Sequence, residues 1–127
     1  MAESPALKIA RAHVQAWSNK DFDTARSLLA PDIRVVVITT DPALPVTDLT
    51  GVDSYMQGLL AYAEPIVPGS VHELTGVGDE QHALLALDME MAGGPFGAGS
   101  AAPCARSYLI DNGKIKTEQV VFYIGPR

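Results

Sequence analysis

The sequence predicts an α+β fold in which three helices from the first half of the chain pack against a curved, cone-shaped antiparallel sheet. Apolar residues recur with helical periodicity in the first half, whereas the second half contains β-branched runs and strict alternation. Helices gathered early and strands gathered late are typical of α+β folds, so the expected order of elements is α-α-β-α-β-β-β-β. At 127 residues the chain has the length of one domain, and we expect residues 1–127 to form a single domain.

Two helices are expected at the start of the chain. Ser4 suits the N-cap of the first helix, and Pro5 suits its first turn. Asp21 can cap the second helix, and Pro31 is expected to end it because proline cannot donate the next backbone hydrogen bond. The stripe that follows Pro5 at helical spacing consists of Ala6, Ile9, Ala10, His13, Ala16 and Trp17.

A buried strand and a third helix come next. Residues 33–39 are rich in β-branched side chains and predict a buried strand, after which Pro42 and Pro45 favour a loop. Residues 50–53 resemble a capping box, and Pro65 ends the helix that they begin. The apolar face of this helix is expected to consist of Val52, Tyr55, Met56, Leu59, Leu60 and Ala63.

The rest of the chain predicts four strands. They are expected at residues 70–77, 83–91, 103–110 and 114–124. A turn at residues 111–113 joins the last two. In the second of the four strands one alternate set is entirely apolar, which predicts a face turned to the core: Leu85, Leu87, Met89 and Met91.

Composition and charge exclude several classes of function. The chain is 47% hydrophobic and 19% charged, which is typical of a globular protein, and its net charge is −6. Because Lys and Arg form no cluster that could displace counterions, no nucleic-acid partner is expected. Apolar runs such as residues 35–38 are too short to span a membrane, and residues 1–4 do not resemble a secretory signal. We therefore expect a cytoplasmic protein with no membrane partner.

No metal or cofactor is expected either. His72 and His82, with the acidic residues near them, lack the spacing of metal ligands. Residues 97–102 fit the pattern G-x-G-x-x-A, but no predicted strand precedes them and no helix follows, so a dinucleotide site is not expected. The single cysteine, Cys104, cannot form an internal disulfide and is interpreted as a small buried residue.

Three short segments near the two ends of the chain carry a family resemblance: residues 16–21 (AWSNKD), 28–32 (LLAPD) and 112–115 (NGKI). Together with the order of elements they resemble the nuclear-transport-factor-2-like superfamily with its cystatin-like fold, and most closely its SnoaL-like and ketosteroid-isomerase-like branch. The resemblance implies an apolar pocket inside the cone and a homodimer formed through the outer face of the sheet. Relatives include isomerases, polyketide cyclases, dehydratases (lyases), epoxide hydrolases and proteins that only bind or assemble, and the fold does not choose among them.

The isomerase residues of this branch can be carried over position by position. The tyrosine donor falls at His13, the aspartate base at Val37, and the protonated aspartic acid at Arg106. All three positions depart from the isomerase pattern, and Val37 cannot accept a proton. Asp41, just beyond the first strand, could replace the base, although an Asp-Pro pair in a loop is equally a turn former.

His13 has two interpretations. It lies on the apolar face of the first helix, four residues from both Ile9 and Trp17. An imidazole that points into a cavity is a candidate acid or base because its pKa lies near neutrality. It could equally be a core histidine that bonds to the backbone, and the match implied by the resemblance favours the catalytic interpretation.

Arg106 and Glu118 belong to the last predicted hairpin, and its turn decides whether they meet. A two-residue turn at 112–113 would place Arg106 opposite Gln119, whereas a three-residue turn at 111–113 would place it opposite Glu118. We favour the second register because it pairs opposite charges. An Arg–Glu pair that faces an apolar cavity would hold a carboxylate charged and oriented, while the alternative is a salt bridge on the outer face without chemistry.

The sequence therefore predicts acid–base chemistry on a hydrophobic cyclic or polyketide-like substrate in an apolar cone, without a cofactor. The alternative is a ligand-binding or dimeric interaction module of the same fold that has no turnover. The candidate catalytic residues are His13, Asp41, Arg106 and Glu118. The residues expected to bind the substrate are Trp17, Val37, Tyr55, Leu59, Leu87, Met89, Met91, Tyr108, Val120 and Phe122.

Overall fold

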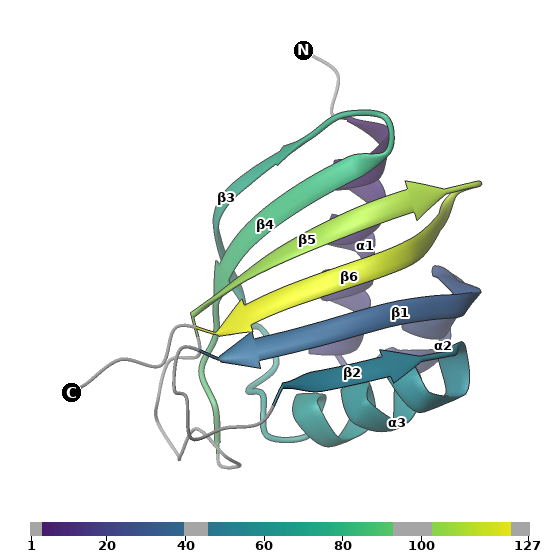
Figure 1. The fold of residues 1–127 in the computed structure, drawn as a ribbon. Coiled ribbons are helices and arrows are strands. Elements are labelled where there is room, and N and C mark those ends of the chain that lie inside the picture. Colours follow the sequence, from purple (N-terminus) through teal and green to yellow (C-terminus); the bar gives the residue numbers. More distant parts are fainter. Residues whose placement is uncertain (1–3, 40–45, 93–102, 123–127) are drawn as a thin grey trace.

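The computed structural model describes residues 4–39, 46–92 and 103–122, in which three helices pack against a six-stranded sheet (Figure 1). The helices are α1 (Pro5–Ser18), α2 (Phe22–Ser27) and α3 (Val52–Ala63). The strands are β1 (Leu29–Thr39), β2 (Thr47–Thr50), β3 (His72–Gly78), β4 (His82–Asp88), β5 (Cys104–Asp111) and β6 (Lys114–Phe122). The predicted α+β fold class is confirmed. No helix in the described residues is long and apolar enough to cross a bilayer.

The N-caps predicted for the first two helices are present. Ser4 Oγ accepts a hydrogen bond from the N–H of Leu7 at 3.0 Å, and Asp21 Oδ1 accepts one from the N–H of Thr24 at 3.2 Å. The capping box predicted for α3 is wrong. Gly51 stands at the N-cap with a φ of 96°, and no side chain caps the helix.

The second helix is shorter than predicted. It ends at Ser27 rather than at Pro31, and β1 begins at Leu29. The cause lies at the far end of the sequence, because the N–H of Ile115 donates a hydrogen bond of 2.8 Å to the carbonyl oxygen of Leu28. Pairing with β6 therefore draws the backbone into the sheet before Pro31 can act as a helix stop.

The sheet has the strand order β2-β1-β6-β5-β4-β3. Neighbouring strands are antiparallel except for β1 and β6, which run parallel. The prediction of an antiparallel sheet is therefore wrong at this one pair. Parallel neighbours require a long connection, and here the chain between β1 and β6 contains β2, α3, β3, β4 and β5.

The strand β2 is an element that the sequence did not predict. It lies antiparallel to β1, with Thr47 opposite Val37 and Leu49 opposite Val35. A run of four residues is too short to show a clear alternation, and Pro45 just before it favours a loop. This short edge strand lies beside α3 and forms one wall of the pocket described below (Figure 1).

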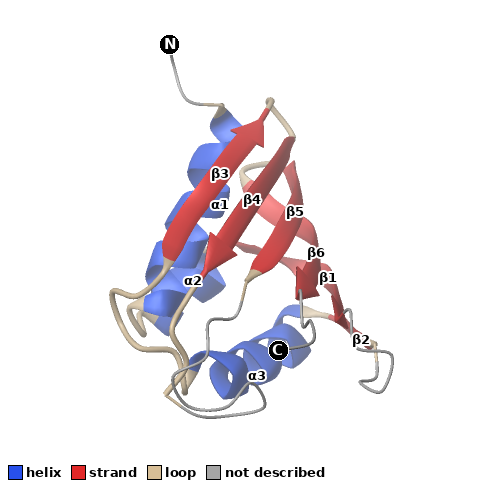
Figure 2. Ribbon diagram, turned by 90° about the vertical axis from the view of Figure 1, so that its left-hand side faces the viewer, coloured by secondary structure: helices blue, strands red, loops and turns tan. Residues whose placement is uncertain are grey.

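The sheet curves so that its inner face and the helices enclose the core (Figure 2). α1 packs against β3, β4, β5 and β6, whereas α3 packs against β1 and β2. The inward alternation predicted over residues 83–91 is confirmed, since Leu85, Leu87, Met89 and Met91 are all buried, although β4 itself ends at Asp88. The largest apolar side chains that the core encloses fully are Trp17, Ile33, Ile66, Leu85, Leu87, Met89, Met91 and Ile115.

Candidate functional site

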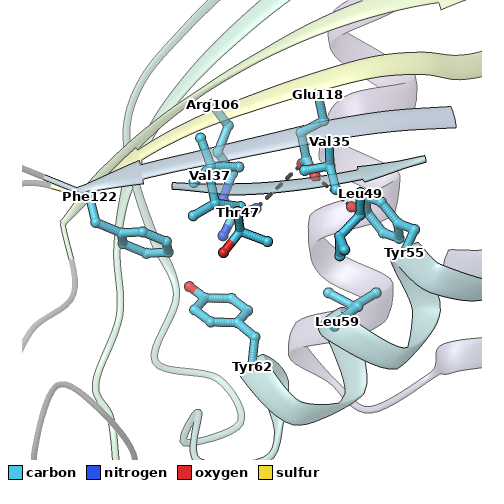
Figure 3. Close-up of a pocket in the computed structure, with 12 residues that line it drawn as sticks. Val35, Val37, Thr47, Leu49, Tyr55, Leu59, Tyr62, Arg106, Glu118 and Phe122 are labelled. Atoms are coloured by element: carbon cyan, nitrogen blue, oxygen red, sulfur yellow. Dashed lines mark hydrogen bonds and ion pairs between the residues drawn. The ribbon is translucent and has the colours of Figure 1, made fainter. Parts of the chain in front are cut away.

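A pocket of about 260 Å³ lies between α3 and the strands β1, β2, β5 and β6 (Figure 3). Its apolar lining consists of Val35, Val37, Leu49, Gly58, Leu59, Val120 and Phe122. Polar atoms come from Thr47, Tyr55, Tyr62, Arg106 and Glu118. An apolar cavity with a few convergent polar groups is the form that small-molecule sites take in proteins.

Glu118 is the buried carboxylate of this pocket, with 2% of its surface exposed. The hydroxyl of Tyr55, on α3, donates a hydrogen bond to Glu118 Oε1 at 2.6 Å. The Nη1 of Arg106, on β5, donates one to Glu118 Oε2 at 3.3 Å. Each carboxylate oxygen thus has a donor from a different element, as the dashed lines in Figure 3 show, which fixes the orientation of the carboxylate.

The β5–β6 hairpin places Arg106 and Glu118 on one face but not opposite each other. A two-residue turn at 112–113 is followed by a bulge in β6, so Arg106 pairs with Val120 and Tyr108 pairs with Glu118. The register favoured from the sequence is therefore wrong, because it did not include the bulge. The observed pairing differs from the predicted one by two positions, and side chains alternate with a period of two, so both groups still point inward.

Arg106 lies in a cage of three aromatic rings. Its Cζ is 4.9 Å from the ring centroid of Trp17, 5.4 Å from that of Tyr62 and 5.9 Å from that of Phe122. These distances are within the range of cation–π attraction. Arg106 is 3% exposed, and its Nε has no hydrogen-bond partner among the described residues.

The hydroxyls of the tyrosines around the pair are protonated at neutral pH. Burial and the charge of Glu118 raise the pKa of Tyr55 well above its usual value, and the same two causes raise the pKa of Tyr108. Burial raises the pKa of Tyr62 to about 12. The hydroxyl of Tyr62 contacts Met89 Sδ at 3.0 Å, whereas that of Tyr108 has no hydrogen-bond partner in the described part of the chain.

His13 lies behind the pocket rather than in its lining. Its ring is fully buried, 5.9 Å from the ring of Tyr55, and neither ring nitrogen has a hydrogen-bond partner in the described residues. Burial lowers the pKa of His13 to about 4, although the charge of Glu118 acts in the opposite direction. The imidazole is therefore neutral at pH 7.

The structure brings together two of the four candidate catalytic residues. Arg106 and Glu118 line the pocket and contact each other. His13 is absent from the lining and lies 5.9 Å from the ring of Tyr55, and its role as an acid or base stays a prediction. Asp41 lies outside the described residues.

The predicted substrate-binding residues divide into two groups. Those that line the pocket are Val37, Tyr55, Leu59, Val120 and Phe122. Those that are buried but absent from the lining are Trp17, Leu87, Met89, Met91 and Tyr108. The second group lies outside this lining because α1 covers the half of the sheet near β3 and β4, whereas the pocket occupies the other half. A substrate-binding role for these residues stays a prediction.

Several lining residues were missed by the sequence analysis: Val35, Thr47, Leu49, Gly58 and Tyr62. Tyr62 carried a usable signal, since it follows Leu59 by three positions and Tyr55 by seven on one face of α3. Thr47 and Leu49 belong to β2, where the sequence favours a loop.

No group of three or more His, Cys, Asp or Glu side chains that could hold a metal ion occurs in residues 4–39, 46–92 and 103–122. The G-x-G-x-x-A segment at residues 97–102 lies outside these ranges. The polar groups that the lining contributes are a carboxylate, a guanidinium and hydroxyls.

Comparison with solved structures places this fold among known ones. A protein from Kribbella flavida DSM 17836 is 27% identical, with a TM-score of 0.79 over 94% of this chain and 88% of that one. A protein from Mycobacterium tuberculosis, in complex with estradiol-17β-hemisuccinate, is 17% identical, with a TM-score of 0.71 over 93% of each chain. A ketosteroid isomerase-like fold from Catenulispora acidiphila DSM 44928, in complex with trimethylamine, is also 17% identical, with a TM-score of 0.71 over 96% of this chain and 88% of that one.

The sequence itself matches a family. No curated protein of known function matches the chain. The family described as the SnoaL-like domain matches residues 10–118, which include α1 from Ala10 onward, the whole of α3 and the residues Arg106 and Glu118. The resemblance to the nuclear-transport-factor-2-like superfamily is thereby confirmed, and the chain belongs to the SnoaL-like domain family.

Proposed function

We propose that this protein is a cofactor-independent enzyme that performs acid–base chemistry on a small apolar molecule, with Glu118 as the group that accepts and returns a proton. The observation that carries the proposal is the position of Glu118. It is a carboxylate with 2% exposure that lines an otherwise apolar pocket and is held by one donor on each oxygen. A base that is desolvated and oriented before the substrate binds can act without reorganising solvent.

The neighbouring residues have distinct roles in this proposal. Arg106 supplies a permanent positive charge, so that Glu118 is not an isolated charge in the apolar interior. Tyr55 holds the second oxygen at 2.6 Å and fixes its direction. His13, neutral and packed against Tyr55, acts as a positioning residue.

The reaction class that fits one carboxylate best is an isomerisation. Moving a proton from one atom of a substrate to another requires a single group that takes the proton and then returns it. Cyclisation, dehydration and epoxide hydrolysis each place a further demand on the site, such as a second acid or a bound water. The two relatives with a small organic molecule in complex support the use of this fold for small ligands.

Glu118→Gln tests the proposal, because it keeps the size of the side chain and removes the base. We expect the native protein to exchange acidic C–H hydrogens of some members of a panel of cyclic and aryl ketones with D₂O, as followed by proton NMR. The Glu118→Gln variant should lose this exchange by about 10²- to 10⁴-fold, the usual contribution of a general base. Glu80→Gln, on an exposed turn residue, is the matched control and should retain the native rate.

Binding measured on the same variant separates lost chemistry from lost folding. A Glu118→Gln protein that still binds the exchanging ketone and exchanges it at the native rate would rule out Glu118 as the base.

A non-catalytic ligand-binding or dimeric interaction module is the second candidate. The observation in its favour is Val37, which lines the pocket at the position where the resemblance implies the isomerase base. If the protein is such a module, both the native protein and Glu118→Gln should bind the ligand without exchanging its C–H hydrogens. Sedimentation equilibrium tests the homodimer that the superfamily resemblance implies.

A further inference from the structure

We infer that the pocket selects small apolar molecules that carry a hydrogen-bond-accepting oxygen and rejects those that carry an ammonium group, because Arg106 already occupies the cation position of the site. This inference names the ligand class for the proposed function and rests on it.

The cage would suit a cation if Arg106 were absent. Rings from three elements, Trp17 on α1, Tyr62 on α3 and Phe122 on β6, surround one point within 6 Å, and the carboxylate of Glu118 lies next to it. Aromatic rings around a point, with a negative charge nearby, are the arrangement by which proteins bind alkylammonium groups. Here the guanidinium of the chain itself fills that place, so a second cation would meet a like charge.

The guanidinium of Arg106 can also donate a hydrogen bond to a ligand. An arginine carries five N–H donors, and Nη1 of Arg106 donates one hydrogen bond to Glu118 Oε2, at 3.3 Å. Buried donors are normally paired, yet Arg106 Nε has no partner among the described residues. Because Arg106 lines the pocket, an acceptor oxygen placed against it gains a charge-assisted hydrogen bond that an ammonium or a hydrocarbon cannot make.

The volume limits the rest of the ligand. An apolar cavity of about 150 Å³ is enough to hold benzene. A pocket of about 260 Å³ therefore accommodates one ring with a short substituent. The ligand class is an aryl or cyclic carbonyl or carboxylate compound of one-ring size.

Four one-ring probes of similar size test the inference on the native protein. Acetophenone carries a carbonyl, phenylacetate a carboxylate, benzylamine an ammonium at pH 7, and ethylbenzene no polar group. We expect acetophenone or phenylacetate to bind at least about tenfold more tightly than both benzylamine and ethylbenzene in NMR titrations, a tenfold ratio being 1.4 kcal/mol. The tighter of the two oxygen compounds identifies the head group as carbonyl or carboxylate.

The other outcomes each count against the inference. Benzylamine that binds as tightly as the oxygen compounds would show that Arg106 does not exclude cations. Ethylbenzene that binds equally well would show that Arg106 makes no contribution. Binding of none of the four probes would overturn the inference and the pocket of the proposed function together, whereas preserved exchange in Glu118→Gln bears on the chemistry alone.

The variant Arg106→Ala provides a second test, because it empties the cage. Methylguanidinium should bind there and raise the Tm of Arg106→Ala while leaving the Tm of the native protein unchanged. Arg106→Ala leaves Glu118 buried without its counter-ion, so the double variant Arg106→Ala/Glu118→Gln serves as the comparison that lacks both charges and should respond less. An Arg106→Ala protein that neither folds nor gains stability with methylguanidinium contradicts the assignment of the cage as a cation site.

Discussion

His13 enters the core as a neutral imidazole, and this makes the stability of the protein depend on pH. Burial lowers its pKa from 6.5 to about 4 in the folded state, so the unfolded chain binds a proton at a higher pH than the folded chain does. The contribution of neutral His13 to the free energy of unfolding is fully present above pH 6.5 and is lost as the pH falls toward 4. The expected loss in the free energy of unfolding over this window is about 3 kcal/mol, at 1.4 kcal/mol per pH unit.

Urea unfolding of the native protein and of His13→Leu between pH 7.5 and pH 4 measures this loss. Subtracting the two curves removes the titration of the carboxylates that both proteins share. The variant should have the flatter profile, whereas His72→Gln, at an exposed position on β3, should follow the native curve. Parallel profiles for the native protein and His13→Leu would show that His13 is not the titrating group.

Gly58 is a residue whose missing side chain enlarges the pocket. A glycine in the interior of a helix costs about 1 kcal/mol relative to alanine, yet Gly58 lies inside α3. A Cβ at this position would lie 3.1 Å from Leu49 Cδ1, and both residues line the pocket. We expect Gly58→Ala to leave the Tm nearly unchanged, because gained helix propensity offsets the close contact, and to weaken binding of the one-ring probes.

Gln57→Ala, on the exposed side of the same helix, is the matched control for Gly58→Ala. It should leave probe binding at the native level in the same NMR titration. Equal affinities in Gly58→Ala and the native protein would mean that the glycine serves the packing of α3 on β2 alone.

At the scale of elements, the last hairpin shows what alternation can and cannot predict. The period of two assigned Arg106, Glu118 and Phe122 to one face, and all three are buried there. The register was wrong because a bulge depends on how β6 fits both of its neighbours, and no local motif in the sequence marks it. The face of each side chain could therefore be predicted, but the contacts between side chains could not.

Lys20 connects the first two helices to the C-terminal end of α3. It has a left-handed φ of 65°, and its Nζ donates hydrogen bonds to the carbonyl oxygens of Ala63 and Glu64. Carbonyls in the last turn of a helix lack partners within the helix. The carbonyl oxygen of Ala63 already accepts a hydrogen bond of 3.1 Å from the N–H of Ile66, and Lys20 adds a donor to it and to that of Glu64. We expect Lys20→Met to lower the free energy of unfolding by about 1 kcal/mol in urea titrations, the usual net value of a hydrogen bond.

Lys8→Met is the matched control, because Lys8 lies at an exposed position of α1. It should have little effect on the free energy of unfolding. If the two variants unfold at the same urea concentration, the contact of Lys20 with α3 contributes nothing to stability.

At the scale of the whole molecule, the fold class and the position of most elements could be predicted because period and turn residues are local signals. Such local signals predicted the helix at residues 52–63 and the inward orientation of Leu85 and Leu87 on β4. The parallel pairing of β1 with β6 and the edge strand β2 were not predicted, because strand partners are set by contacts between distant segments. The pocket depends on those contacts, which explains why its wall was harder to predict than the core.

The central place of the β1–β6 pair bears on how the chain folds as it is synthesised. β1 is made early, but the neighbour that pairs with its inner edge, β6, is the last strand of the described residues. Until that strand leaves the ribosome, β1 carries an open edge, and such edges invite association with other chains. Contacts between segments so distant in sequence also slow folding. Because Glu118 and Phe122 arrive with β6, a nascent chain completes its core and its pocket in the same late step.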